Sequence, residues 1–316
     1  MSRVSGIVVL VVVSSVLAFA VDNPTCSVQN AAVAGQRVIL QCEEPQLLAS
    51  KDQGTSWQPI PFAYDTAIRA LKFLDDSRGF MAGDACLLLA SDDGGRTWAN
   101  VTVPSKENLT GMSFVGNEGW ISGYGGVILH SADGGKTWSA QTTGVTQALE
   151  NVYFADASHG WAVGWIGTII RTSDGGASWK EAQNITGADV TWSLNAVYFR
   201  DPQNGWAIGF NGQMLRSKDG GANWAAMKSP VRATLTSLLF DKNGMGYIAA
   251  GSDILLSKDG GETWSSIEIE DQVFISHVMK VNDSIWAVGE FGILVQKGAD
   301  QKWQRLALDQ FDQTAS

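Results

Sequence analysis

The chain has few of the residues on which metal binding and nucleic-acid recognition depend. Its 316 residues include three cysteines and three histidines. His130, His159 and His277 lie far apart, and no Cys/His cluster has the spacing of zinc ligands. Basic residues number 22 against 32 acidic ones, a net charge of −10, whereas phosphate recognition needs a basic surface. The sequence therefore predicts no metal, no cofactor and no nucleic-acid partner.

Uncharged sequence of nearly membrane-spanning length occurs only at the N-terminus. Residues 4–21 carry no charge and follow Arg3. Ala18-Phe19-Ala20 has the small-x-small pattern of signal-peptidase cleavage, so residues 1–20 are interpreted as a signal peptide cleaved near Ala20. The alternative is an uncleaved membrane anchor. We expect an exported, periplasmic protein, tethered to the membrane if the segment is retained, with one domain over residues 26–310 and a tail over residues 311–316.

A short phrase recurs about every forty residues through the rest of the chain. Its consensus is Ser-x-Asp-Gly-Gly-x-x-Trp, and the seven copies end at Trp57, Trp98, Trp138, Trp179, Trp224, Trp264 and Trp303. The first copy is partly degenerate, and the last keeps only its tryptophan. A period of this length indicates an array of similar supersecondary units.

The phrase is an Asp-box, also called the bacterial neuraminidase repeat. Its aspartate accepts hydrogen bonds from backbone amides of its own turn, and its glycines supply backbone angles that side chains disfavour. Its tryptophan begins the next strand and packs against a neighbouring unit. Because the phrase is repeated, its aspartates are assigned a structural role: Asp52, Asp93, Asp133, Asp174, Asp219 and Asp259.

A second repeated pattern precedes each box and defines the fold class. It reads Phe154…Gly160-Trp161-Ala162-Val163-Gly164 in the fourth unit, followed by a short apolar run that leads into the box. Each unit thus has four short apolar segments separated by turn residues, with no sustained helical period. The prediction is an all-β, seven-bladed β-propeller of four-stranded antiparallel blades, with the Asp-boxes between the third and fourth strands.

Two of the three cysteines flank a predicted hairpin turn at Ala34-Gly35. Cys26 and Cys42 lie about equally far from that turn and would face each other on adjacent strands. In an exported protein they are expected to form a disulfide, the alternative being two reduced, buried thiols. Cys86 is left over as a free thiol, with no neighbour that would activate it.

Two surfaces are candidates for binding a partner. Aromatic residues occupy the turns between second and third strands: Tyr124, Trp165, Phe210 and Phe291. They form either an exposed binding cluster or rings folded over neighbouring loops. On the opposite face, a basic strip is expected from His130, Arg171 and Arg216, joined by Arg200, which either docks acidic groups or pairs with nearby aspartates.

The chemistry of known Asp-box enzymes is not evident. No Arg-x-Pro motif of sialidases occurs, and Asp75, Asp156 and Asp201 share one repeat position, which marks them as turn formers. Xyloglucanase-type enzymes work between two propellers, and this chain has sequence for one. The chain is therefore expected not to be an enzyme. The alternative is a carbohydrate-active protein, either a lectin-like binder or a sialidase- or xyloglucanase-type hydrolase.

Both repeated patterns together resemble one family. Phe154–Trp179 and Phe199–Trp224 look like repeats of the photosystem II assembly and stability factors of chloroplasts and cyanobacteria. The resemblance implies a non-catalytic, lumenal propeller that binds newly made reaction-centre subunits through an arginine patch. Arg171 and Arg216 fall on the family's Ile/Leu-Arg-Thr/Ser position, and Arg200 lies beside it. We therefore expect a monomeric scaffold for a membrane or exported protein, which is a photosystem II subunit in the thylakoid lumen if the host is photosynthetic.

Overall fold

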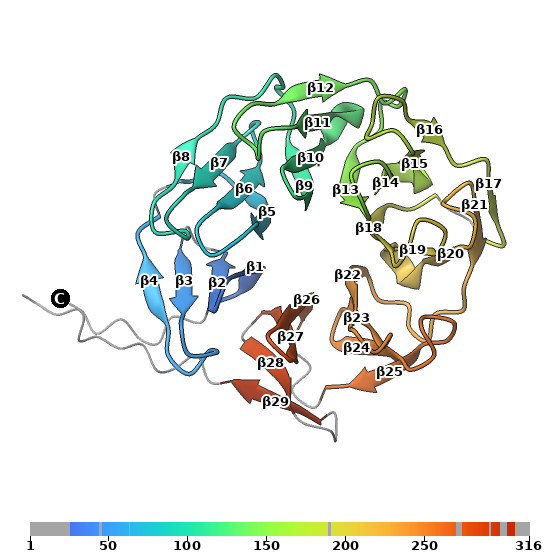
Figure 1. Ribbon diagram of the computed structural model, residues 1–316. Helices are drawn as coiled ribbons and strands as arrows, with labels where there is room; N and C mark the ends of the chain where they lie inside the picture. Colours follow the sequence, from blue (N-terminus) through green and yellow to red (C-terminus); the bar gives the residue numbers. More distant parts are fainter. Residues whose placement is uncertain are drawn as a thin grey trace, which may run out of the picture.

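The computed structural model describes residues 26–43, 46–62, 64–188, 191–269, 274–290, 292–297 and 302–306. Their strands form seven hydrogen-bonded sheets, which we number one to seven in chain order. The sheets stand around a common centre, with the first strand of each innermost (Figure 1). The predicted signal peptide, cleavage site and C-terminal tail lie outside the described residues.

Each sheet is antiparallel along its four consecutive strands. Sheets one to three comprise β1 (Val28–Ala34), β2 (Arg37–Cys42), β3 (Leu47–Ser50), β4 (Gln58–Ile60); β5 (Ile68–Phe73), β6 (Gly79–Gly83), β7 (Leu88–Ser91), β8 (Ala99–Asn100); and β9 (Leu109–Val115), β10 (Glu118–Gly123), β11 (Ile128–Ser131), β12 (Ser139–Gln141). Sheets four and five comprise β13 (Leu149–Phe154), β14 (Gly160–Gly164), β15 (Ile169–Thr172), β16 (Lys180–Glu181); and β18 (Leu194–Phe199), β19 (Gly205–Gly209), β20 (Met214–Ser217), β21 (Asn223–Ala226), with β17 (Asn184–Thr186) added. Sheets six and seven comprise β22 (Leu235–Phe240), β23 (Gly246–Ala250), β24 (Asp253–Ser257), β25 (Ser265–Glu268); and β26 (Ile275–Val281), β27 (Ser284–Gly289), β28 (Gly292–Lys297), β29 (Lys302–Leu306).

The predicted propeller of four-stranded antiparallel blades is confirmed for six sheets and differs in sheet five. There β17 pairs in parallel with β21, with Asn184 opposite Asn223, and makes a fifth, outermost strand. The longest interval between repeats, 45 residues from Trp179 to Trp224, contains this strand. The extra length therefore covers an outer edge that would otherwise present unpaired backbone groups.

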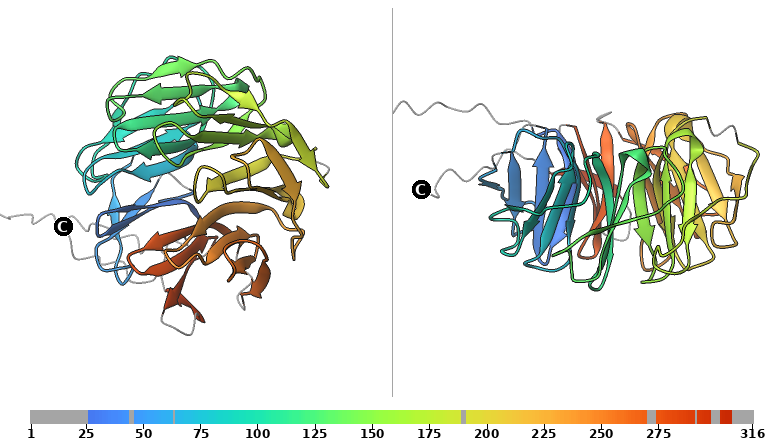
Figure 2. Two further views of the ribbon diagram at one scale, coloured as in Figure 1. Left: turned by 45° about the vertical axis from the view of Figure 1, so that its right-hand side comes forward. Right: turned by 90° about the horizontal axis from the view of Figure 1, so that it is seen from above.

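The molecule has two faces, which Figure 2 shows as the two sides of a flat ring. We call one the Asp-turn face, because it carries the repeated turns between third and fourth strands. The amide of Gly175 donates to the Ser158 carbonyl, so the turn between first and second strands lies on the same face. The other is the connection face, where turns between second and third strands meet the segments that enter each sheet, as when the Trp165 amide donates to the Ala148 carbonyl. Three of these turns are single 3₁₀ turns, η1 (Tyr124–Gly126), η2 (Trp165–Gly167) and η3 (Phe210–Gly212).

Aromatic ring contacts join sheets two to seven in succession. The second-strand Trp161 stacks on Phe199 of the following sheet, with ring centroids 3.5 Å apart, and its indole N–H donates to the Gly220 carbonyl at 2.9 Å. Phe199 in turn meets the edge of Trp224 from its own sheet. Both tryptophans are almost fully buried. The repeated tryptophan thus braces its own sheet, whereas the second-strand tryptophan makes the junction to the next one.

The ring closes between sheets seven and one without exchanging a strand. Each end sheet is built from one contiguous stretch of chain. Ser276 Oγ donates to the Val28 carbonyl at 3.0 Å across the junction. Trp286 and Val288 share a buried cluster with Trp57 and Val28. The closing junction is therefore of the same kind as the other junctions.

The predicted disulfide is confirmed. Cys26 and Cys42 are bonded, with their Cα atoms 5.3 Å apart, at the open end of the β1–β2 hairpin. Both cysteines are buried in the cluster that closes the ring. Among the described residues, no helix is long and apolar enough to cross a membrane.

Candidate functional site

The repeated turns on the Asp-turn face are closed hydrogen-bonded units. In sheet two, Ser91 Oγ donates to Asp93 Oδ1 at 2.8 Å and accepts from the Gly95 amide at 2.8 Å. Thr97 donates its amide to Asp93 Oδ1 and its hydroxyl to Oδ2, the latter at 2.6 Å. The carboxylate is thereby consumed by its own turn. The same bonds recur at Asp52, Asp133, Asp174, Asp219 and Asp259.

These bonds favour the ionised carboxylates. Hydrogen bonds from the Thr263 side chain and amide lower the pKa of Asp259 to about 2, and those from Ser56 do the same for Asp52. Every carboxyl in the described residues with a resolved shift has a lowered pKa. A catalytic acid at neutral pH needs a raised pKa, and none of the shifted carboxyls has one.

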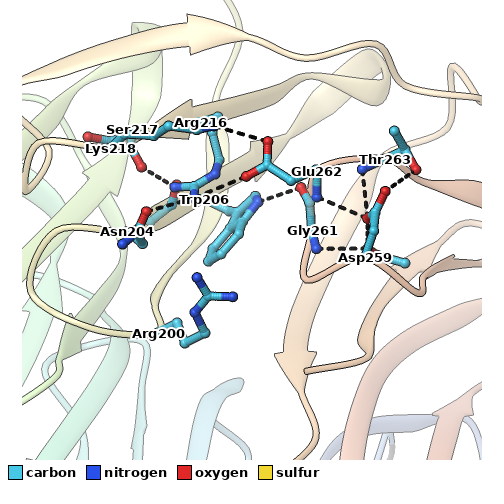
Figure 3. A network of polar contacts seen from close by, with 12 residues as sticks. Arg200, Asn204, Trp206, Arg216, Ser217, Lys218, Asp259, Gly261, Glu262 and Thr263 are labelled. Carbon is cyan, nitrogen blue, oxygen red and sulfur yellow. Dashed lines mark hydrogen bonds and ion pairs between the residues drawn. The ribbon is translucent and has the colours of Figure 1, made fainter. Parts of the chain in front are cut away.

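A cluster of cations gathers between sheets five and six on the Asp-turn face (Figure 3). Arg216 lies over the Trp206 ring, with its guanidinium carbon 4.1 Å from the ring centroid. Its Nη1 donates to the carbonyls of Gly205 and Ser217, and its Nη2 donates to Asn204 Oδ1 at 2.9 Å. Arg216 is only 8% exposed, and burial lowers its pKa. Arg216 is therefore a fixed, largely satisfied charge.

Glu262, from sheet six, balances part of this charge. Its carboxylate lies 3.6 Å from Arg216 Nη2 and accepts from Lys218 Nζ at 3.1 Å, and the Lys218 bond lowers the pKa of Glu262. The Lys218 side chain is exposed. The guanidinium carbon of Arg200 lies 5.7 Å from the centroid of the Trp206 ring, and its Nε lies 3.8 Å from Asp201 Oδ2. Three cations thus face two carboxylates, and the cluster keeps a positive charge.

Two open cavities meet at this cluster. One, of about 690 Å³, lies between sheets five and six and is lined by Arg216, Lys218, Met227, Lys228, Glu262 and Trp264, among others. The other, of about 470 Å³, lies beside β17 and is lined by Asn184, Thr186, Arg216, Lys218 and Trp224, among others. Arg216 and Lys218 line both cavities, and we call the two cavities together the groove. Cations shared by two adjoining cavities suit an extended chain bearing a carboxylate.

The structure brings together part of the predicted basic strip. Arg200 and Arg216 share the Trp206 ring, whereas Arg171 lies one sheet away beside Trp161. The Nε atom of Arg171 is buried with no hydrogen-bond partner among the described residues. Lys218 and Glu262 were missed, although Lys218 occupies the variable position of its own Ser-x-Asp phrase.

The predicted aromatic residues lie on the connection face. Tyr124 packs against Trp165, with centroids 5.5 Å apart, and is half-buried. Trp165 and Phe210 are both exposed. Phe291 lies outside the described residues. No group of three or more metal-ligating side chains occurs within the part of the chain that the structure describes.

The fold and the repeated turns define a class of β-propellers built from bacterial neuraminidase-type repeats. The sequence profile of the photosynthesis system II assembly factor YCF48 family matches residues 48–144, 140–229 and 223–311. The chain belongs to that family. Among curated proteins, it is 36% identical over 66 residues to photosystem II assembly lipoprotein Ycf48 of Prochlorococcus marinus strain MIT 9312, and 36% identical over 66 residues to that of Picosynechococcus sp. strain PCC 7002. Each match covers about a fifth of the chain and about a fifth of the relative.

Solved structures share the fold at low sequence identity. YCF48 bound to a D1 peptide superposes with a TM-score of 0.62 at 23% identity, over 76% of this chain and 82% of that one. YCF48 from Cyanidioschyzon merolae superposes with a TM-score of 0.59 at 18% identity, over 72% of this chain and 80% of that one. A virginiamycin B lyase from Staphylococcus aureus superposes with a TM-score of 0.73 at 12% identity, over 86% of this chain and 94% of that one. At these identities the likeness shows the fold alone.

Proposed function

We propose that this protein is a non-catalytic assembly factor that holds a photosystem II reaction-centre subunit through the groove around Arg216 and Lys218. Family membership supports the role. The solved YCF48 relative with a D1 peptide supports the class of partner. The observation that carries the proposal is the cationic centre at which two cavities meet. Arg216 is held rigid by Asn204 and Trp206, so an incoming carboxylate in the larger cavity needs to order only the side chains of Lys218 and Lys228.

The remaining features follow from that role. We infer that the seven sheets are the blades of a seven-bladed ring and that the repeated turns are Asp-boxes, which keep the groove's walls in place. The protein acts as a monomer on the exported side of a membrane, the periplasm or the thylakoid lumen. The curated relatives are named lipoproteins, which supports a membrane-associated location. Arg171 extends the basic surface toward sheet four.

Peptide binding tests the proposal. A fluorescent D1 peptide should bind the full chain, and Lys218→Gln and Lys228→Gln, which change two cations lining the larger cavity, should each weaken binding about tenfold, since a hydrogen bond to a charged group contributes about 1.5 kcal/mol. Added salt should weaken binding by the wild-type chain more than by either variant. Arg232→Gln removes an exposed cation on the connection face and serves as the matched control.

Equal affinity of all four proteins would reject the groove as the binding site. Absence of peptide binding by the wild-type chain would reject the proposed partner. Anisotropy titrations at two salt concentrations distinguish these results.

A further inference from the structure

Exposed apolar side chains are concentrated on the connection face. Among the described residues, the large hydrophobic side chains classed as exposed are Trp165, Ile166, Trp192, Phe210 and Phe274. All five lie in turns between second and third strands or in segments that enter a sheet. The Asp-turn face has none of them. A scatter of surface hydrophobic residues would not favour one side in this way.

Four of these residues lie on neighbouring segments over sheets four and five, and we call them the aromatic patch: Trp165, Ile166, Trp192 and Phe210. The Gly167 amide donates to the Trp192 carbonyl at 3.0 Å, and the Phe210 amide donates to the carbonyl of the next residue, Ser193, at 3.1 Å. Backbone bonds therefore hold the two turns and the connecting segment side by side. The exposed fractions are 46% for Trp165, 66% for Ile166, 55% for Trp192 and 42% for Phe210.

Ile166 is unfavourable at its position for two reasons, its backbone conformation and the exposure of its side chain. Its φ of +55° is left-handed, a region in which a β-branched residue is strained. The equivalent positions are Gly125 in η1 and Asn211 in η3, residue types that tolerate this conformation. The most exposed hydrophobic side chain of the described residues thus lies at the tip of a turn where a polar residue would cost less. Neither folding nor solubility explains the choice.

The described chain begins on this same face. Cys26 and Ser27 lead into β1, which is the first strand of its sheet, and first strands begin on the connection face. The described chain therefore starts on the side that carries the aromatic patch, and an uncleaved anchor over residues 4–21, the alternative to cleavage near Ala20, would lead into that side. Tryptophan, phenylalanine and isoleucine on one face beside such a stretch suit the boundary between lipid headgroups and acyl chains.

We propose that the connection face rests on a lipid bilayer, with the aromatic patch inserted at the interface. The indole N–H of Trp165 is already bonded to Glu150, so its ring enters lipid with no unpaired donor. With a net charge of −10, the protein gains no general attraction to anionic lipid, and insertion is driven by apolar contact. The groove around Arg216 then faces away from the bilayer. This inference goes beyond the peptide-binding role and stands or falls separately from it.

Fluorescence quenching by brominated lipid tests the contact. The full chain is mixed with phosphatidylcholine vesicles brominated along the acyl chains, which quench only tryptophans that touch lipid. We expect quenching of the wild-type chain, and its loss in a Trp165→Ser, Trp192→Ser variant. Addition of anionic lipid should not increase it. Lys136→Trp places an exposed tryptophan on the Asp-turn face as the matched control, and this added ring should not be quenched.

Ile166→Asn provides a second variant that leaves every tryptophan in place. It removes an inserted side chain and restores a residue suited to the turn, so the fold is retained while vesicle partitioning falls about tenfold. An unquenched wild-type chain, or quenching that survives the double substitution, overturns the proposal. Concentration-dependent dimers in sedimentation, abolished by these substitutions in the absence of vesicles, overturn it in favour of a second copy as the occupant.

Discussion

At the scale of single residues, the junctions between sheets depend on glycines that leave space for an aromatic ring. Gly261 has a φ of +87°, and a Cβ placed there would lie 2.6 Å from the Trp206 ring of the preceding sheet. Gly54 bears the same relation to Trp286 across the closing junction, at 2.9 Å. Glycine is needed at these positions for its backbone conformation and for its lack of a side chain.

Gly261→Ala should therefore be more destabilising than backbone strain alone explains. Gly244→Ala is the matched control, since Gly244 has a φ of +80° with no atom within 4 Å of a built Cβ. The overpacked variant should lose about 1–3 kcal/mol more than the control in the free energy of unfolding. Urea denaturation measures both variants. Equal losses would mean that the Trp206 ring moves aside at little cost.

The position of Arg216 could be predicted from the sequence, but its environment could not. The repeated register places a cation or histidine beside three of the second-strand tryptophans, as with His130 on Trp120 and Arg216 on Trp206, whereas Trp286 pairs with Val295. The burial of Arg216 depends on Asn204 in its own sheet and on Glu262, 46 positions further on, in the next sheet. Such contacts between units depend on how the units pack, which the repeat pattern does not specify.

At the scale of secondary-structure elements, the β1–β2 hairpin is the part most dependent on a covalent bond. Its disulfide closes a loop with a sequence separation of 16 residues. Cys26→Ala together with Cys42→Ala should cost about 3 kcal/mol, the loop-closure entropy for this length. Cys86→Ser, which alters the free thiol, should change stability by less than about 0.5 kcal/mol.

Thermal unfolding with and without reductant measures both effects. Reductant should lower the Tm of the wild-type chain and leave that of the double variant unchanged. A wild-type Tm that is insensitive to full reduction would contradict the stabilising role of this bond.

The regular spacing of the chain made most elements predictable, because each unit repeats the same turn chemistry. Strand β17 was not predicted, since Asn184-Ile185-Thr186 has no counterpart in the other units. Its only sequence signal was the long interval before Trp224. A three-residue segment gains strand structure from the edge it covers rather than from its own composition.

At the scale of the whole molecule, pH should affect stability in two stages. Burial lowers the pKa of His277, on the innermost strand of sheet seven, to about 4 from 6.5. Between pH 6.5 and pH 4, the unfolded chain binds a proton at His277 that the folded chain does not bind. The contribution of His277 to the free energy of unfolding is therefore complete above pH 6.5 and is lost as pH falls toward 4. Below pH 4, the turn carboxylates whose pKa is about 2, such as Asp259 and Asp52, become protonated. Their contribution to the free energy of unfolding is then also lost as the pH falls.

His277→Leu should remove the loss of stability between pH 6.5 and pH 4 and leave the loss below pH 4 unchanged. The difference from the wild-type chain should reach at most about 3 kcal/mol between pH 7 and pH 4. His159→Gln changes an exposed histidine on the Asp-turn face and is the control. Urea midpoints at a series of pH values give both curves, and a wild-type curve flat from pH 7 to pH 4 would refute the role of His277.

At four junctions of the ring, an aromatic side chain of one unit lies against a glycine of the next unit: Phe80 at Gly135, Trp161 at Gly221, Trp206 at Gly261 and Trp286 at Gly54. A gene rearrangement that duplicated or removed the fifth unit, which carries both Trp206 and Gly221, would leave each remaining ring of this set facing a glycine. Such a change in the number of units therefore requires no new kind of contact at these junctions. It alters instead the curvature of the ring and the width of its central opening.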